Sequence, residues 1–142
     1  MRLFFDTNVL LDGLLLREPF ADDAAHLFAL VTTGAHTGIL SATTATDIFY
    51  IARKQVGSEP ARSLLRDLLR LFEVAPVDGP VLFAALDLPG FPDVEDAVQP
   101  EAARLAGADA TVTRNTADFG ASVLPVFTPA AMRERLATDG SV

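Results

Sequence analysis

The sequence predicts one α/β domain built on a mainly parallel β-sheet. Short apolar runs of strand length alternate along the chain with longer segments in which apolar residues recur at helical spacing. The first apolar run, residues 3–5, ends abruptly in Asp6, as a strand buried on both faces does. At 142 residues, half of them hydrophobic, the chain can bury a core of ordinary domain size.

Each predicted element has a recognisable start or stop signal. Ser41 is a good N-cap for the helix that follows it, and Gly57 closes that helix. Thr128 followed by Pro129 is a strong helix start. The expected strands cover residues 3–5, 37–40, 72–77, 110–113 and 123–127. The expected helices cover residues 19–31, 42–55, 60–72, 78–86, 94–106 and 128–137. Residues 1–137 form the predicted domain, and residues 138–142 are expected to be a frayed tail.

The composition narrows the classes of function. The formal net charge of −8 disfavours simple coating of nucleic acid, which usually relies on a basic surface. A nuclease stays compatible, because carboxylates that hold divalent cations add to the negative charge. The chain has no cysteine and two histidines, so a metal site would use oxygen ligands, which suit Mg²⁺ or Mn²⁺. No apolar run approaches the ~20 residues of a membrane span, and no basic leader precedes the first strand. We therefore expect a cytoplasmic protein without membrane contact.

Acidic residues recur where predicted strands end and predicted helices begin. The acids in these places, together with one inside an otherwise uncharged helix, are Asp6, Asp47, Asp93, Glu95, Asp96 and Asp118. Strand ends and helix starts meet along one edge of such a sheet, which is also the edge where open α/β sheets bind ligands. Carboxylates gathered there would raise one another's pKa unless a cation neutralised them. A divalent metal with oxygen ligands would do so.

Each acid also has a purely structural interpretation. Asp6 could cap the next helix, and Asp93 could cap the helix at 94–106, with its two acidic neighbours at the positive end of the helix dipole. Asp118 could be an ordinary turn residue. Asp47 is harder to explain in this way, because Asp is a poor mid-helix residue. Its apolar neighbours predict a largely buried helix, in which a carboxylate needs a partner or a metal.

Four motifs follow one another along the chain. They are Phe-Asp-Thr-Asn-Val-Leu-Leu-Asp (5–12), Ser-Ala-Thr-Thr-Ala-Thr-Asp-Ile-Phe-Tyr (41–50), Asp-Val-Glu-Asp-Ala-Val-Gln (93–99) and Ala-Gly-Ala-Asp-Ala-Thr-Val-Thr-Arg-Asn-Thr-Ala-Asp-Phe (106–119). In this combination and order they resemble the PIN domain family, nearly end to end. Within that family the chain is most similar to small stand-alone prokaryotic domains, including the VapC-type toxins of toxin–antitoxin pairs.

The resemblance implies a three-layer α/β/α sandwich with a central parallel sheet, and hydrolysis of RNA phosphodiester bonds with Mg²⁺ or Mn²⁺ as cofactor. The family's first acid falls on Asp6, and its third falls on Asp96, with Asp93 as the weaker claimant. Its second acid, usually Glu, falls on Asp47. Because Asp is one methylene shorter, Asp47 would bind the metal through water or help to position the nucleophile.

The fourth acidic position is ambiguous. Where many members have Asp the chain has Asn115, an oxygen donor without charge, and Asp118 follows three residues later. The resemblance thus assigns catalytic roles to Asp6, Asp47, Asp96 and Asp118, and metal ligation to Asp6, Asp96 and either Asp118 or Asn115. Polar groups that would support these acids or contact the substrate are Thr7, Asn8, Asp93, Thr113 and Arg114.

Pro100 is unusual within the helix predicted at 94–106. It lies in the second turn and lacks the amide hydrogen that would bond to the carbonyl of Asp96, so a kink is expected. Either the helix restarts near Pro100, or the predicted metal site is distorted.

Two other functions compete with the nuclease. A catalytically weak PIN fold that acts as an interaction module is favoured by Asp47, Asn115 and Pro100. A receiver-type or α/β-hydrolase domain with Asp6 as its nucleophile is disfavoured. A receiver carries a lysine near the last strands, whereas the single lysine of this chain is Lys54.

The expected partners follow from the resemblance. They are an RNA substrate, a second copy in a homodimer, and an antitoxin whose tail enters the acidic site, where an arginine or lysine would be attracted. Basic residues that could guide RNA, or could simply lie on the solvated surface, are Arg53, Lys54, Arg104 and Arg114.

Overall fold

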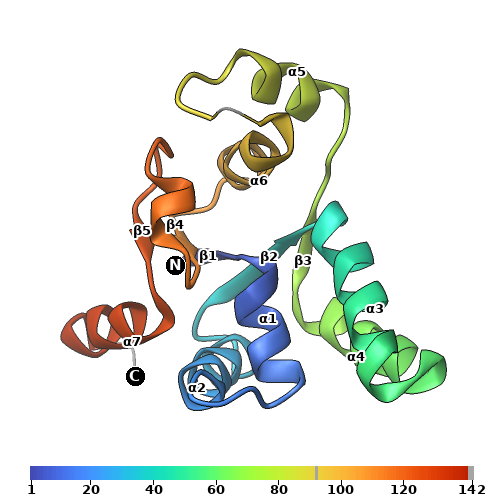
Figure 1. Ribbon diagram of the computed structural model, residues 1–142. Helices are drawn as coiled ribbons and strands as arrows, with labels where there is room; N and C mark the ends of the chain where they lie inside the picture. Colours follow the sequence, from blue (N-terminus) through green and yellow to red (C-terminus); the bar gives the residue numbers. More distant parts are fainter. Residues whose placement is uncertain (92, 141–142) are drawn as a thin grey trace.

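The chain folds around a sheet whose strands lie in the order β3-β2-β1-β4-β5 (Figure 1). The structure, a computed structural model, describes residues 1–91 and 93–140. Within those residues the sheet has five strands, and every neighbouring pair is parallel. The strands are β1 (Arg2–Phe5), β2 (Thr37–Ser41), β3 (Glu73–Ala75), β4 (Ala110–Val112) and β5 (Val126–Phe127).

Helices cover both faces of the sheet, which confirms the predicted three-layer α/β/α fold (Figure 1). One face carries α5 and α6, and the other carries α1, α2, α3, α4 and α7. Their bounds are α1 (Thr7–Leu14), α2 (Ala21–Thr32), α3 (Ala42–Val56), α4 (Ser58–Leu71), α5 (Gly79–Asp87), α6 (Val94–Leu105) and α7 (Pro129–Thr138), and a 3₁₀ turn, η1, covers Thr116–Phe119. None of the helices described is both long and apolar enough to cross a membrane.

Successive side chains of the central strand β1 enter two different cores. Leu3 and Phe5 pack beneath α1 and α2 in one hydrophobic cluster, whereas Phe4 joins the cluster beneath α5 and α6. All three are buried. Side chains of a strand point alternately to the two faces of a sheet, so a strand covered on both faces must be apolar at every position. The uninterrupted run 3–5 has this origin.

The strand order fixes where a ligand site can form. Strands β2 and β3 extend the sheet from one side of β1, and β4 and β5 extend it from the other. The carboxyl ends of β1 and β4 therefore lie side by side, and the amide of Asp6 donates to the carbonyl of Val112 at 2.9 Å. Open α/β sheets bind ligands in the crevice at such a switch point. Asp6 and Thr113, the residues that follow the two strands, stand at its base.

Several helix starts are confirmed by their capping contacts. The side chain of Ser41 accepts a hydrogen bond from the amide of Thr44 at 3.1 Å, and that of Thr128 accepts one from Ala131 at 3.1 Å. Asp93 occupies the N-cap position of α6, but its side chain makes no capping bond. The predicted N-cap position of Asp93 is therefore confirmed, whereas the expected hydrogen bond from its side chain to the helix is not formed.

Other details differ from the predictions. Helix α1 begins directly after Asp6, although no helix is among the elements expected between residues 6 and 18. It forms because its apolar residues, among them Val9, bury a continuous face. Helix α6 runs unbroken through the buried Pro100, so of the two alternatives for this helix the restart does not occur; small buried residues around Pro100 hold the helix against the sheet. The last strand is limited to its final two residues. Of the expected tail, Thr138 ends α7, and residues 141–142 lie outside the described residues.

Replacement of Gly38 by Ala is expected to destabilise the fold. Gly38 lies in β2, and a Cβ atom there would lie 2.5 Å from the Cε2 atom of Phe72. That ring is itself packed edge to face against Phe5 and Phe28. Overpacking of this kind reduces the free energy of unfolding by about 1–3 kcal/mol, which urea denaturation would measure. Gly79→Ala is the control, since its Cβ would meet nothing within 4 Å; an equal loss in both variants would contradict the explanation.

Candidate active site

A pocket of about 390 Å³ lies at the switch point, and all the charged side chains in its described lining are acidic. Its acids are Asp6, Asp47, Glu95, Asp96 and Asp118. They come from four separate segments: the β1–α1 junction, α3, the first turn of α6, and η1. Within the described parts of the chain, no lysine or arginine lines this pocket. The resemblance assigns catalytic roles to four acids, and in the structure all four line this one strongly negative pocket.

Asp6 is held by three hydrogen bonds. Its Oδ2 accepts from the hydroxyl of Thr113 at 2.7 Å and from the side-chain amide of Asn8 at 3.2 Å. Its Oδ1 accepts from the backbone amide of Thr7 at 2.9 Å, which makes Asp6 the N-cap of α1. The same carboxylate caps a helix and lines the pocket, so the two interpretations of Asp6 do not exclude each other.

The environment of Asp6 disfavours its charge. Burial raises the pKa of the Asp6 carboxyl above its ordinary value, and the negative charge of Asp118 raises it further. The hydrogen bonds from Thr113, Thr7 and Asn8 oppose this rise without cancelling it. A nearby cation would offset both the lost hydration and the repulsion, so the carboxylate would gain from binding one.

A chain of polar side chains connects the helices around the pocket. The hydroxyl oxygens of Thr7 and Thr44 lie 2.9 Å apart, and the side-chain amide of Gln99 donates to the same oxygen of Thr44 at 2.9 Å. This network ties α1 and α3 to α6 beneath the acids. Gln99 also lines the pocket, and within the described residues its buried Oε1 has no hydrogen-bond partner.

Asp47 is exposed, which corrects the prediction that it lies on a largely buried helix. Of the described residues of α3, only Thr44, Ile48 and Ala52 are buried, while Tyr50 lies on the surface. Part of the apolar character of this segment comes from exposed side chains, those of Tyr50 and Ile51. Asp47 therefore needs no buried partner, and its carboxylate is part of the open wall of the pocket.

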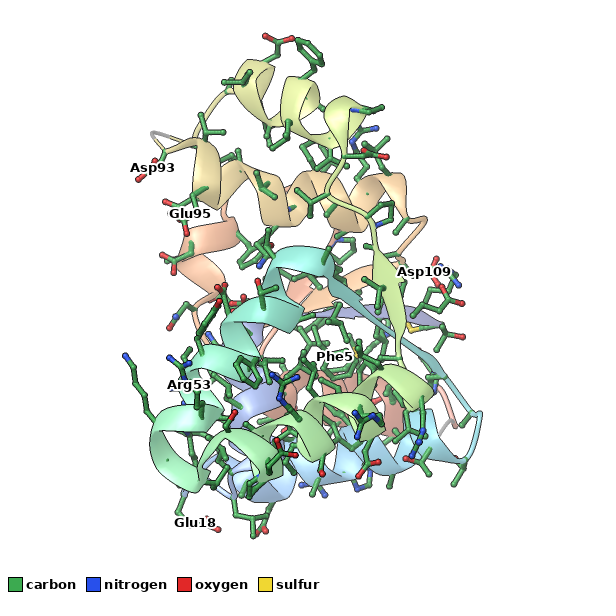
Figure 2. All side chains as sticks on the ribbon, turned by 90° about the vertical axis from the view of Figure 1, so that its right-hand side faces the viewer. Phe5, Glu18, Arg53, Asp93, Glu95 and Asp109 are labelled. Atoms are coloured by element: carbon green, nitrogen blue, oxygen red, sulfur yellow. The ribbon has the colours of Figure 1, made fainter. Side chains whose placement is uncertain are left out.

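Two other predicted metal-site residues are not among the described lining of the pocket. Asp93 is exposed at the start of α6, on the same side of the molecule as Glu95 (Figure 2). Asn115 is exposed as well, and its backbone amide donates to the hydroxyl of Thr113 at 3.1 Å. Of the two residues that could fill the ambiguous fourth position, Asp118 lines the pocket.

Arg114 is committed to a different contact. Its Nε lies 2.7 Å from Oδ2 of Asp12, which is fully buried, and its Cζ lies 4.2 Å from the centroid of the Phe20 ring. The backbone amide of Arg114 donates to the side-chain oxygen of Asn8 at 3.4 Å. The residue thus braces the loop after β4 against α1, and its guanidinium is not part of the pocket lining described here.

Comparison with known proteins agrees with this geometry. The family model of the PIN domain matches residues 2–117. The chain belongs to the PIN domain family. No curated protein matches the sequence at a significant level.

Solved structures share the fold of this PIN domain at low sequence identity. VapBC2 from Rickettsia felis, bound to a DNA fragment from its promoter, has a TM-score of 0.70 and 18% identity over 90% of this chain and 98% of that chain. A toxin–antitoxin complex from Klebsiella pneumoniae has a TM-score of 0.67 and 24% identity over 89% and 97%. VapC20 from Mycobacterium tuberculosis, a toxin that cleaves the sarcin–ricin loop, has a TM-score of 0.62 and 15% identity over 77% and 86%.

On α6 of the PIN domain, the resemblance gives no role to two polar residues that line the pocket, although Glu95 is among the acids expected at this edge of the sheet. Glu95 and Gln99 lie four residues apart on α6 and flank Asp96, so all three line the pocket. Gln99 follows Asp96 by three residues and Glu95 by four. On a predicted helix this spacing is the signal that could have placed Gln99 on the same face as the two acids.

The donors of the pocket suit a hard divalent cation. Every charged group in its described lining is a carboxylate, and Gln99 adds an unpaired amide oxygen, which together form the kind of ligand set that Mg²⁺ and Mn²⁺ prefer. Over the described residues, however, no three acidic or histidine side chains are gathered closely enough to form a metal site. Chemically the residues fit the cation, and binding would require their side chains to approach one another.

Proposed function

We propose that this PIN domain is a metal-dependent endoribonuclease that hydrolyses RNA phosphodiester bonds. One observation carries the proposal: Asp6, Asp47, Asp96 and Asp118, far apart in the sequence, line one pocket that contains no described basic residue. A pocket with this charge repels an RNA phosphate unless cations are bound there. The acids therefore make sense as the ligands of a divalent metal.

Within the proposed site the residues have different tasks. Asp6, Asp96 and Asp118 would hold Mg²⁺ or Mn²⁺, and Thr113, Thr7 and Asn8 fix the orientation of the Asp6 carboxylate through their hydrogen bonds. When bound, the cation would supply Lewis acidity, stabilising charge on the transferring phosphoryl group and making water a stronger nucleophile. Asp47, on the open wall, would orient that water.

A role as the toxin of a toxin–antitoxin pair is part of the proposal. The solved structures with this fold include complexes of that kind from Rickettsia felis and Klebsiella pneumoniae. An antitoxin could insert an arginine or lysine into the acidic pocket and so compete with the metal. The proposal includes the homodimer that the resemblance implies, and action on cytoplasmic RNA.

The proposal is tested by incubating the chain with a panel of labelled single-stranded RNAs at millimolar Mn²⁺ and, in parallel, with excess EDTA. Cleavage with Mn²⁺ and none with EDTA is expected. Equal cleavage under both conditions would contradict metal dependence. Absence of cleavage across a panel with varied loops and sequences would favour the second candidate, a PIN fold that acts as an interaction module.

Asp47→Glu is expected to increase cleavage about threefold to tenfold. The longer side chain restores the acid that the family usually has at this position. From an exposed position it can reach further into the pocket without disturbing the core. Initial rates at a fixed Mn²⁺ concentration give the comparison, with Asp22→Glu on the exposed surface at the start of α2 as the control. An unchanged or lower rate in Asp47→Glu would mean that the shorter side chain is not what limits this site.

The interaction module has one observation in its favour. No three acidic side chains of the described residues are already arranged around a metal position. Such a module would keep the acidic pocket as a receptor for a basic segment of a partner. Metal affinity separates the two candidates, because only the nuclease requires it.

A further inference from the structure

A second pocket, of about 530 Å³, adjoins the acidic pocket on the outer surface of α3 and α4. Thr46 of α3 lines both pockets, so they are contiguous along that helix. We call the second one the arginine groove, after its most prominent lining residues, Phe49, Tyr50, Arg62, Arg66 and Arg70. In Figure 2, Arg53 on α3 and Glu95 on α6 lie on the same side of the molecule.

The arginine groove has the opposite charge to the acidic pocket. Of the 11 basic residues of this acidic chain, five lie on α3 and α4: Arg53, Lys54, Arg62, Arg66 and Arg70. The last three are four residues apart, which places them along one face of α4. No acid is among the described residues that line the groove.

The arginines of the groove make only weak ion pairs within the described part of the chain, or none, so their charge is available to bind a ligand. Arg62 lies 3.9 Å from Glu59, and Arg70 lies 3.3 Å from Asp67, but both pairs are largely exposed and therefore weak. Arg66 makes no ion pair with any residue of the described chain. The groove can thus attract a polyanion without first breaking a strong internal contact.

Aromatic rings are interleaved with the positive charges. The rings of Phe49 and Tyr50 lie 5.6 Å apart; Tyr50 is 55% exposed and Phe49 is half-buried. The guanidinium of Arg53 lies 5.3 Å from the Tyr50 ring centroid, and that of Arg62 lies 5.4 Å from the Phe49 centroid. Exposed rings and guanidinium planes are the surfaces on which unpaired bases stack in proteins that bind single strands.

We propose that the arginine groove binds the single-stranded RNA segment that flanks the bond to be cleaved. Bases stack on Phe49 and Tyr50, while their phosphates contact Arg62, Arg66 and Arg70. The strand then passes Thr46 and enters the acidic pocket. This inference rests on the proposed nuclease function of that pocket. A paired RNA keeps its bases stacked inside the helix, so the aromatic part of the groove selects unpaired segments.

The test measures RNA binding without cleavage. Fluorescence anisotropy in excess EDTA, at about 50 mM salt, compares a labelled 12-nucleotide single strand of mixed sequence with the blunt duplex of the same sequence. Arg66→Gln/Arg70→Gln is compared with the matched control Arg133→Gln/Arg135→Gln on α7, since each double variant removes two arginine charges outside the core. Tyr50→Leu tests stacking, and Asp6→Asn tests the acidic pocket. Circular dichroism melting verifies that each variant is folded.

The groove variants are expected to weaken binding specifically. Arg66→Gln/Arg70→Gln weakens single-strand binding roughly tenfold, and the slope of log K against log salt becomes shallower by about 1.4, since each phosphate contact on a single strand contributes about 0.7. Tyr50→Leu weakens binding by about fivefold or more. The α7 control binds as the wild type does, and the duplex binds more weakly than the single strand. Asp6→Asn removes one negative charge from the pocket that the strand enters, so in EDTA it binds at least as tightly as the wild type.

Several results would overturn the proposal. They are no RNA binding by the wild type, equal losses in the groove and α7 variants, or duplex binding as tight as single-strand binding. A change of oligomeric state in the groove variants without loss of RNA binding would instead assign the groove to a protein interface. Failure of the nuclease function is distinguished by its own signature, which is RNA bound in the groove but never cleaved with Mn²⁺.

Discussion

Replacement of Asp6 by Asn is expected to reduce RNA cleavage about a thousandfold. Asp6 lies at the switch point of the sheet, and the hydrogen bonds from Thr113, Thr7 and Asn8 hold its carboxylate at the base of the acidic pocket. Asn keeps the size of the side chain and removes the charge that would hold a cation. Loss of several kcal/mol of transition-state stabilisation by the metal corresponds to a rate change of this order.

The same substitution is expected to preserve or increase stability at neutral pH. Because the pKa of Asp6 is raised in the folded protein, the folded state retains its proton to a higher pH than the unfolded state does. Stability of the wild type therefore falls as pH rises through the ordinary pKa of aspartate, until the raised pKa is passed. Asn has no such ionisation, so the advantage of the variant should appear over this interval and persist above it.

Urea denaturation at several pH values, combined with cleavage assays, measures both effects of Asp6→Asn. Asp22→Asn, an exposed acid at the start of α2, is the control with the same change in charge. A loss of cleavage accompanied by unfolding would make Asp6 a structural cap and no more. Retained cleavage in a stable Asp6→Asn variant would remove Asp6 from the proposed mechanism.

Arg114→Met is expected to destabilise the fold by about 3 kcal/mol at neutral pH. Asp12 is fully buried, and Arg114, 2.7 Å from its carboxylate, is its ion-pair partner. Removal of one member of a buried pair leaves the other charge uncompensated, at a cost of about 3–5 kcal/mol. We expect a loss near the lower end of this range for two reasons. Arg114 is partly exposed, and the positive charge of Arg17 still stabilises the Asp12 carboxylate, although more weakly than Arg114 does.

The pH dependence of this loss separates charge from packing. Burial raises the pKa of Asp12, whereas the charge of Arg114 lowers it, so removal of Arg114 raises this pKa further. The destabilisation should be complete at neutral pH and should shrink as acid protonates Asp12 in the folded wild type as well as in the folded variant. Asp12→Asn should partly restore the stability of Arg114→Met. Arg53→Met, which removes an arginine stacked on aromatic rings, is the control, and an equal loss there would contradict the account.

Most of the fold could be predicted from the sequence, because its strands are covered on both faces. The run 3–5 needed no alternation to be recognised as a strand, and the polar residue that ends it marks the carboxyl edge of the sheet. Two helix starts, at Ser41 and Thr128, could be predicted equally well. At each, a residue with a side-chain oxygen is followed by apolar residues at helical spacing. Helix α1 could not be predicted, since the apolar residues after Asp6 also fit a continuing loop or strand.

The composition of the acidic pocket could be predicted in part. Asp6, Asp96 and Asp118 follow from the places of strand ends and helix starts. The exposure of Asp47 could not be foreseen, because Phe49 and Tyr50, close to it in the sequence, line a surface groove instead of a core. The buried pair of Asp12 and Arg114 joins residues 102 positions apart, and no local pattern reports such a contact.

Calorimetric titration of Mn²⁺ into the wild type and into Asp6→Asn measures whether the acidic pocket binds a divalent metal through Asp6. We expect saturable binding by the wild type in the micromolar to sub-millimolar range, and loss of that binding in Asp6→Asn. Absence of binding by the wild type at millimolar Mn²⁺ would contradict the nuclease. The acidic pocket would then be the receptor site of an interaction module.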